Sequence, residues 1–308
     1  MKIYILDPFH MTGVEYAAKH FEVVRWDDPR VKNWHEDADG LMVRMTRVTA
    51  ADIAKAKKVR IIGKQGVGYD TVDIAAAKAK GIPVVRTPGV NSEAVAELAL
   101  ALALAASRRV VELDRRIRAG EPVPRPDYLA VELQGKTVGV IGVGNIGSRV
   151  ARKWHAAFNA NVIGYDPYKD VMPCVKKDQL RDLLAEADLV TIHCPLNDET
   201  RHMIGARQLS WMKKGAVIVN TARGGIIDER ALYDALKSGH LFGAGIDVWE
   251  EAEPPAKDHP LLALPNVVAT PHVAGNTFET QERSAMQVAT QVVDVLKGKP
   301  PVAANRVA

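Results

Sequence analysis

The sequence predicts an α/β protein with two doubly wound parallel sheets. Short β-branched runs alternate with helical stretches along the whole chain, as they do when helices connect parallel strands. The length of 308 residues suggests more than one domain. The β-branched runs of the second half are numerous enough to form a doubly wound sheet of their own.

The first third of the chain predicts a small α/β sandwich. One of its helical segments begins at Thr49, a favourable N-cap residue, and another ends at Gly81, which suits a helix C-terminus. The predicted strands are residues 2–6, 40–44, 59–64 and 83–86, and the predicted helices are residues 11–20, 49–58 and 71–80.

A long helix and a proline-rich stretch precede the second sheet. Residues 91–109 are rich in Ala and Leu, with Glu93 in the first turn, and predict one helix that connects two domains. The prolines of residues 121–126 exclude a helix interior or a central strand, so this stretch predicts a surface connection. The predicted strands of the second sheet are residues 137–141, 161–165, 189–193, 216–220, 243–248 and 267–269.

Composition excludes several classes of protein. Hydrophobic residues make up 47% and charged residues 25%, which is ordinary for a folded globular chain and argues against disorder. Lys and Arg number 41 against 37 Asp and Glu, so the formal net charge is +4. That charge is too small and too scattered to predict a nucleic-acid partner, and the arginines of residues 108–118 have no interleaved aromatic side chains.

The cysteines, the N-terminus and the longest apolar stretch limit the setting in which the protein works. Cys174 and Cys194 cannot form a disulfide framework, which indicates a reducing, cytoplasmic compartment. No acid or second histidine stands at metal-ligand spacing from His193 and Cys194, so we expect no metal site. The N-terminus lacks a signal-peptide apolar region. Residues 95–106 are too short to span a bilayer, so we expect no membrane partner.

A glycine-rich turn is the strongest local motif. Gly142, Gly144 and Gly147 follow the predicted strand 137–141 and precede a helical stretch, residues 148–158. In that context the backbone can approach a pyrophosphate at a helix N-terminus. Asp166 lies 19 residues after Gly147 (166 − 147), where a carboxylate can bind the adenosine ribose and favours NAD over NADP. The alternative is a glycine turn with no ligand.

Two further motifs follow predicted strands. Arg223 comes just after residues 216–220, where a guanidinium could hold a carboxylate, although a surface ion pair is the alternative. His272 comes just after residues 267–269 and suits proton transfer near neutral pH. A carboxylate from the acidic run 250–254 could fix its tautomer, although a structural histidine and a solvated loop are the alternatives.

Taken together, these motifs resemble the D-isomer-specific 2-hydroxyacid dehydrogenase family over essentially the whole chain. The resemblance rests on the glycine turn and on residues 66–70, 87–97, 193–196, 221–224, 247–248, 253–254 and 271–275. It implies a flavodoxin-like substrate domain, residues 1–98 and 276–308, with an inserted Rossmann NAD-binding domain, residues 99–275, and an active site in the cleft between them. It also implies a homodimer through residues 110–135.

The resemblance carries roles to particular residues. Catalysis falls on Arg223, Glu253 and His272, with Glu251 as an alternative partner for the histidine. Substrate contacts fall on Arg44, the backbone of Val67 and Gly68, Arg223 and His272. Cofactor contacts fall on Gly142, Gly144, Asn145, Ile146, Gly147, Asp166, Pro195, Thr221, Ala222, Arg223, Asp247, His272 and Gly275. Arg86 and Asn145 depart from the residues that many relatives carry, Asn and Arg respectively.

The implied activity is hydride transfer between NAD(H) and a small (R)-2-hydroxy or 2-oxo acid. Arg44, Lys64 and Arg86 suggest a substrate with a second anionic group, such as 3-phosphoglycerate, hydroxypyruvate, glyoxylate or a sulfonated hydroxy acid, unless these cations are simply solvated. Two competing functions are an NAD-sensing corepressor and a formate dehydrogenase, the second of which would pair the histidine with Gln. Because the sequence ends at Ala308, we expect no C-terminal regulatory domain.

Overall fold

The computed structural model describes residues 1–308 and divides them into two compact units. One unit joins Met1–Asn91 to Asn276–Ala308, and the other is Ser92–Gly275. The first boundary lies before helix α5 (Ser92–Ser107), whereas the sequence predicts it between residues 98 and 99. The reason is that α5 packs along strands β10 and β11 of the second unit, so its first turns belong to that unit.

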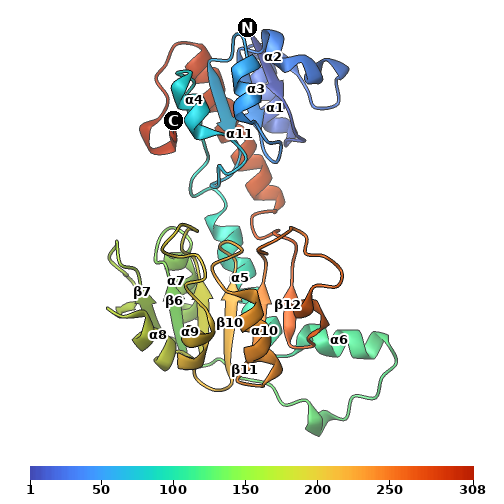
Figure 1. The fold of residues 1–308 in the computed structure, drawn as a ribbon, viewed down its shortest axis with the longest axis vertical. Helices are drawn as coiled ribbons and strands as arrows, with labels where there is room; N and C mark the ends of the chain where they lie inside the picture. The colour runs from blue at the N-terminus through green and yellow to red at the C-terminus, as the bar shows by residue number, and fades with distance from the viewer. The chain divides into compact units, whose positions relative to one another are not determined.

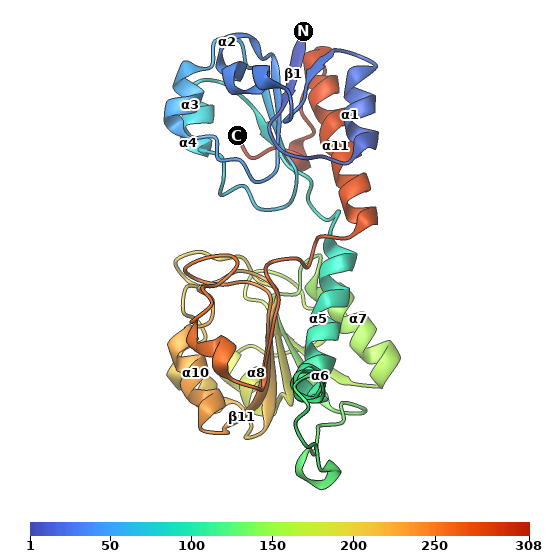
Figure 2. The same cartoon turned by 90° about the vertical axis from the view of Figure 1, so that its right-hand side faces the viewer.

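The first unit is a five-stranded parallel sheet with helices on both faces (Figures 1 and 2). The strand order β2-β1-β3-β4-β5 is the flavodoxin-like order. The strands are β1 (Lys2–Ile5), β2 (Glu22–Val24), β3 (Gly40–Val43), β4 (Ile61–Lys64) and β5 (Val84–Val85). The helices are α1 (Met11–Ala18), α2 (Trp34–Asp37), α3 (Ala50–Lys55), α4 (Ile74–Ala79) and α11 (Phe278–Leu296).

Two apolar cores hold the first unit together, one on each face of the sheet. Helices α1 and α11 cover one face, and α2, α3 and α4 cover the other. Helix α11 comes from the far end of the chain and packs tightly against α1. The two backbones are so close that a Cβ at Gly13 would lie 2.6 Å from the backbone oxygen of Ala285. The last residues of the sequence therefore complete the first unit around residues 1–91.

The second unit is a seven-stranded parallel sheet in the order β12-β11-β10-β9-β6-β7-β8. This is the Rossmann order with one further strand, and the order reverses between β6 and β9. The strands are β6 (Thr137–Ile141), β7 (Asn161–Tyr165), β8 (Val175–Lys176), β9 (Leu189–Ile192), β10 (Ala216–Asn220), β11 (Leu241–Ile246) and β12 (Val267–Ala269). The helices are α5, α6 (Val110–Arg118), α7 (Gly147–Phe158), α8 (Leu180–Glu186), α9 (Ala206–Trp211) and α10 (Glu229–Lys237).

The predicted fold class is confirmed, with two short edge strands that the sequence analysis missed. Strand β2 has three residues and β8 has two, and both residues of β8 are exposed, so neither has the apolar run that marks a central strand. The predicted helix 91–109 ends at Ser107, because Arg109 adopts a left-handed backbone (φ 55°) before α6 begins.

The chain has neither a membrane-spanning helix nor a cluster of metal ligands. No helix is both long enough and apolar enough to cross a membrane. No three His, Cys, Asp or Glu side chains come together in a way that could hold a metal ion, and both cysteines are free.

Candidate active site

The glycine turn between β6 and α7 is shaped by close contacts at its ends and is open in the middle. Gly142 has φ 83°, and a Cβ there would lie 2.7 Å from the backbone nitrogen of Cys194. A Cβ at Gly147 would lie 2.1 Å from the oxygen of Gly142. At Gly144 nothing stands within 4 Å of the Cβ position. The turn therefore presents uncovered backbone at the N-terminus of α7, where a phosphate can approach.

Asp166 joins this turn to the end of β7. Its Oδ2 accepts the amide of Val143 at 3.0 Å, and its Oδ1 accepts the amide of Tyr168 at 3.0 Å. The carboxylate is half-buried at the carboxyl edge of the sheet, next to the switch point between β6 and β9. A ribose diol is the kind of partner that such a carboxylate binds in dinucleotide sites.

The residues after β9 are not suited to nucleophilic or acid–base chemistry. Nε2 of His193 bonds to Oγ1 of Thr191 at 2.8 Å, while its Nδ1 is buried without a partner. Burial lowers the pKa of His193 to about 3, so the ring is neutral. Burial also raises the pKa of the Cys194 thiol to about 11, which keeps it protonated and unreactive.

The turn after β10 holds Arg223 at the same edge of the sheet. The Asn220 side chain accepts the amide of Ala222 at 3.0 Å and donates to the oxygen of Arg223 at 2.9 Å. The guanidinium donates to the oxygen of Ala222 at 2.6 Å, and its other N–H groups make no hydrogen bond within the chain. The Thr221 hydroxyl is buried without a partner. The Arg223 guanidinium and the Thr221 hydroxyl are therefore both available to bind a ligand.

His272 and Glu253 form an acid–base pair. Nδ1 of His272 hydrogen-bonds to Oε2 of Glu253, and Oε1 of Glu253 accepts the amide of Trp249 at 3.1 Å. Burial opposes ionisation of the Glu253 carboxyl. The hydrogen bond and charge of His272, the Trp249 amide and the nearby charge of Arg223 outweigh it, so the pKa of Glu253 lies below its ordinary value. Glu251, the other predicted partner, is exposed and makes no hydrogen bond.

Asp247 holds the loop that carries His272. It is fully buried, and its carboxylate accepts the Thr270 hydroxyl (2.6 Å) and the amides of Val273 (2.9 Å) and Ala274 (3.0 Å). Its backbone oxygen accepts the amide of His272 at 2.6 Å. These bonds keep His272 in a left-handed conformation (φ 58°), which costs free energy for a residue other than glycine. The nicotinamide contact that the resemblance implies for Asp247 stays a prediction.

Trp249 connects the loops that carry Arg223, Glu253 and His272. The sequence analysis did not identify this residue. Its indole nitrogen donates to the oxygen of Thr270 at 2.9 Å, next to the His272 loop. A Cβ at Gly224 would lie 1.9 Å from the Trp249 oxygen, so the Arg223 turn also packs directly against it. The only signal in the sequence is its position between Asp247 and Glu253. A tryptophan at that position is equally typical of an ordinary core residue.

The predicted substrate residues Arg44, Val67 and Gly68 lie in the first unit, after β3 and β4. The amides of Val67 and Gly68 make no hydrogen bond within the chain. Arg86 donates to the oxygen of Val67 at 3.0 Å, and its guanidinium lies 5.4 Å from the ring centroid of Tyr69. The loop is thus held in shape by a cation while it keeps two amides free, as an anion-binding loop requires.

The remaining cofactor residues occupy the same turns of the second unit. Asn145 and Pro195 are exposed, Ile146 and Gly275 are half-buried, and Ala222 is buried. All of them follow a strand at its carboxyl end, as ligand contacts do in doubly wound sheets. The fold and these turns therefore define a dinucleotide-binding domain with a histidine–carboxylate pair and an arginine at its edge.

Comparisons with known proteins identify the family. Residues 100–274 match the model described as the D-isomer specific 2-hydroxyacid dehydrogenase, NAD binding domain. The chain is 44% identical to a D-3-phosphoglycerate dehydrogenase of Methanocaldococcus jannaschii, over 97% of this chain and 58% of that protein. It is 38% identical to a glyoxylate reductase of Korarchaeum cryptofilum, over 97% of this chain and 94% of that protein.

Solved structures agree with this assignment. A D-lactate dehydrogenase of Aquifex aeolicus, complexed with NAD and lactic acid, superposes with a TM-score of 0.84 at 31% identity, over 100% of this chain and 99% of that one. The chain belongs to the D-isomer specific 2-hydroxyacid dehydrogenase family and carries its NAD-binding domain. It spans 58% of the length of the phosphoglycerate dehydrogenases that it matches.

Proposed function

We propose that this protein transfers a hydride between NAD(H) and C2 of a 2-oxo or (R)-2-hydroxy acid. The observation that carries the proposal is the His272–Glu253 pair, with the Arg223 charge beside it, in the same unit as the open glycine turn. A proton donor and a cation next to a dinucleotide turn are the groups that reduction of a 2-oxo acid requires.

The residues present fit a dinucleotide. The open backbone at Gly144 leaves room for a pyrophosphate, and the unpartnered Thr221 hydroxyl offers a hydrogen bond at the end of β10. When bound, NAD(H) supplies or accepts the hydride. Asp166 would bind the adenosine ribose. The other proposed contacts are Gly142, Asn145, Ile146, Gly147, Pro195, Ala222, Asp247 and Gly275.

His272 would move the proton. Because its Nδ1 faces Glu253, Nε2 is the nitrogen that can donate to the oxygen at C2 during reduction and accept from the hydroxyl during oxidation. In reduction a C–H bond forms at C2, the C=O double bond becomes a C–O single bond, and the proton from Nε2 completes the hydroxyl. Glu253 orients the ring and stabilises the imidazolium.

Arg223 would bind the substrate carboxylate and polarise the oxo group. Its guanidinium has N–H groups that no residue of the chain uses, and a planar fork suits a carboxylate. The free amides of Val67 and Gly68, in the first unit, are further proposed substrate contacts. Arg223 is thus proposed both to bind the substrate and to activate it. Arg223→Lys keeps the positive charge but loses the bidentate geometry, so it should raise KM and lower kcat together.

The substrate class is a 2-oxo acid with a second anionic group. Strands β3 and β4 are paired at Val43 and Lys64, so Arg44 and Lys64 lie at one edge of the sheet. A Cβ at Gly66 would lie 3.7 Å from Nζ of Lys64, which places that ammonium beside the Val67–Gly68 loop. Arg86 follows β5 and donates to the oxygen of Val67 in that loop. Together these cations favour a phosphorylated or sulfonated acid over one that has a single carboxylate. The D-3-phosphoglycerate dehydrogenases named above are relatives consistent with this class.

We also propose a homodimer formed through residues 110–135. Helix α6 and the segment after it expose apolar side chains, among them Ile117 at 67% and Leu129 at 76%. Such side chains favour burial against a partner. Light scattering that returns a monomer would remove this part of the proposal.

A substrate screen at fixed NADH tests the activity. We expect oxidation of NADH with 2-oxo acids, faster with hydroxypyruvate 3-phosphate than with pyruvate, and loss of that preference in Arg86→Ala. If no 2-oxo acid is reduced while NADH binds, the proposed activity is wrong and a cofactor-sensing role becomes the better account. Formate as sole reductant of NAD tests for a formate dehydrogenase.

A further inference from the structure

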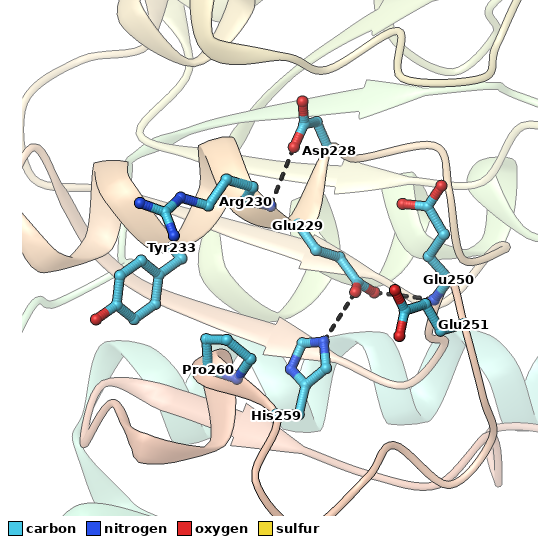
Figure 3. Close-up of a pocket in the computed structure, with 8 residues that line it drawn as sticks. All are labelled: Asp228, Glu229, Arg230, Tyr233, Glu250, Glu251, His259 and Pro260. Carbon is cyan, nitrogen blue, oxygen red and sulfur yellow. Dashed lines mark hydrogen bonds and ion pairs between the residues drawn. The ribbon is translucent and has the colours of Figure 1, made fainter.

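The loop that carries Glu253 is held on another side by a second glutamate–histidine pair. Glu229 is the first residue of α10, and its Oε1 accepts the amide of Glu250 at 2.9 Å. Its Oε2 contacts Nε2 of His259 at 3.0 Å (Figure 3). The side chains of Glu229 and His259 are only 16% and 15% exposed, so these bonds are shielded from competing water.

The contacts of His259 define its tautomer. An ionised Glu229 carboxylate can only accept, so Nε2 of His259 carries the hydrogen. Nδ1 is buried without a partner, so the bond to Glu229 is the one hydrogen bond that the ring makes. The ring packs edge-on against Trp249, with centroids 5.2 Å apart at 76°. The pair therefore holds the Glu250 backbone and the Trp249 ring at the same time.

Trp249 transmits that support to both members of the acid–base pair. Its amide donates to Glu253, and its indole nitrogen donates to Thr270, two residues before His272. A displacement of Trp249 would therefore move the Glu253 carboxylate and the His272 loop together. Proton-transfer geometry is sensitive to displacements of about 1 Å.

We propose that Glu229 and His259 are positioning residues for the reaction assigned above, and this inference rests on that proposed function. Neither side chain hydrogen-bonds to Glu253 or His272, so their effect passes through Trp249. A pocket of about 280 Å³ lies beside the pair and is also lined by Glu250 and Glu251. It gives the loop room to shift when the pair is broken.

Glu229→Ala is the first test. We expect kcat to fall roughly tenfold to hundredfold, because a supporting bond to the catalytic loop is lost. The dissociation constant of NADH, measured by fluorescence titration, should stay within about twofold of wild type, since the pair is not part of the glycine turn. Glu229→Gln should recover part of kcat, because its amide oxygen can still accept from Glu250. Asp234→Ala on the same helix is the control, since Asp234 is exposed and pairs only with Arg230.

A pH profile separates positioning from a general loss of stability. In the reductive direction the acid limb of kcat reports protonation of Glu253, whose neighbouring charges are His272 and Arg223. Weaker bonds to Glu253 raise its pKa, so the acid limb should move to higher pH in Glu229→Ala and His259→Phe but not in Asp234→Ala.

The outcomes distinguish this inference from the proposed function. If wild type reduces no 2-oxo acid, the proposed function fails. If wild type is active and both variants keep its kcat and its acid limb, the positioning role is wrong. If Glu229→Ala loses kcat and NADH binding in parallel with an unmoved acid limb, and Glu229→Gln behaves identically, the pair is structural only and the inference is overturned.

Discussion

Glu253 hydrogen-bonds to Nδ1 of His272, which lies 19 residues further along the chain, and the same carboxylate accepts the amide of Trp249. The bond leaves Nε2 of His272 without a partner in the chain, on a side chain that is 42% exposed. A ring held on one nitrogen and open at the other is the arrangement that directional proton transfer requires.

The first prediction concerns this pair. His272→Ala should lower turnover roughly a hundredfold or more, because positioned acid–base groups commonly contribute that much. NADH binding, measured by fluorescence titration, should stay near normal. Glu253→Gln should also lower turnover, whereas Glu251→Gln should retain most of it because the structure leaves Glu251 exposed and without a hydrogen bond. Equal losses in the two glutamate variants would contradict the pairing.

The fold could be predicted because its pattern is local. Central strands such as β10 are largely apolar with every residue buried, and a helix follows β6, β9 and β10 in turn. Edge strands β2 and β8 could not be predicted, since two or three partly exposed residues carry no such pattern. The same holds for the end of α5, which depends on the left-handed backbone at Arg109.

Only part of the candidate site could be predicted from the sequence. Arg223 and His272 could be located because each follows a buried strand, and a parallel sheet brings all such ends to one edge. The choice between Glu251 and Glu253 depends on the path of a loop, which no periodicity defines. Trp249, Glu229 and His259 act through backbone amides and ring packing, and these contacts follow from tertiary structure rather than from residue type.

The second prediction contrasts two glycines of the turn after β6. Gly147→Ala should destabilise the second unit, because its Cβ would lie 2.1 Å from the Gly142 oxygen and the backbone would have to move. Gly144→Ala should unfold at the same temperature as wild type, because nothing lies within 4 Å of its Cβ position. It should nevertheless bind NADH more weakly, because the added methyl group obstructs the pyrophosphate. Thermal unfolding and NADH titration of both variants provide the check. Unchanged NADH affinity in a folded Gly144→Ala would contradict a cofactor at this turn.

The third prediction concerns the choice of cofactor. Wild type should prefer NADH, because the Asp166 carboxylate repels the 2′-phosphate of NADPH. Asp166→Ser removes that charge while it keeps an acceptor for a neighbouring amide, so the ratio of kcat/KM for NADPH to that for NADH should rise by about tenfold or more. Parallel steady-state kinetics with the two cofactors measure it. A wild-type preference for NADPH would overturn the role given to Asp166.

The last prediction concerns stability below neutral pH. Burial lowers the pKa of His193 to about 3 in the folded protein, against an ordinary value of 6.5. Between these values the unfolded chain binds a proton that the folded chain does not, so the free energy of unfolding should fall as pH drops below 6.5, by up to about 1.4 kcal/mol per pH unit. His193→Gln keeps a hydrogen-bonding group for Thr191 but cannot take up that proton, so its stability should depend less steeply on pH. Denaturant unfolding of wild type and variant at pH 7 and pH 5 gives the two slopes, with His155→Gln, at an exposed position of the same unit, as the control. Identical slopes in wild type and His193→Gln would show that the folded protein accepts the proton at His193 as readily as the unfolded chain does.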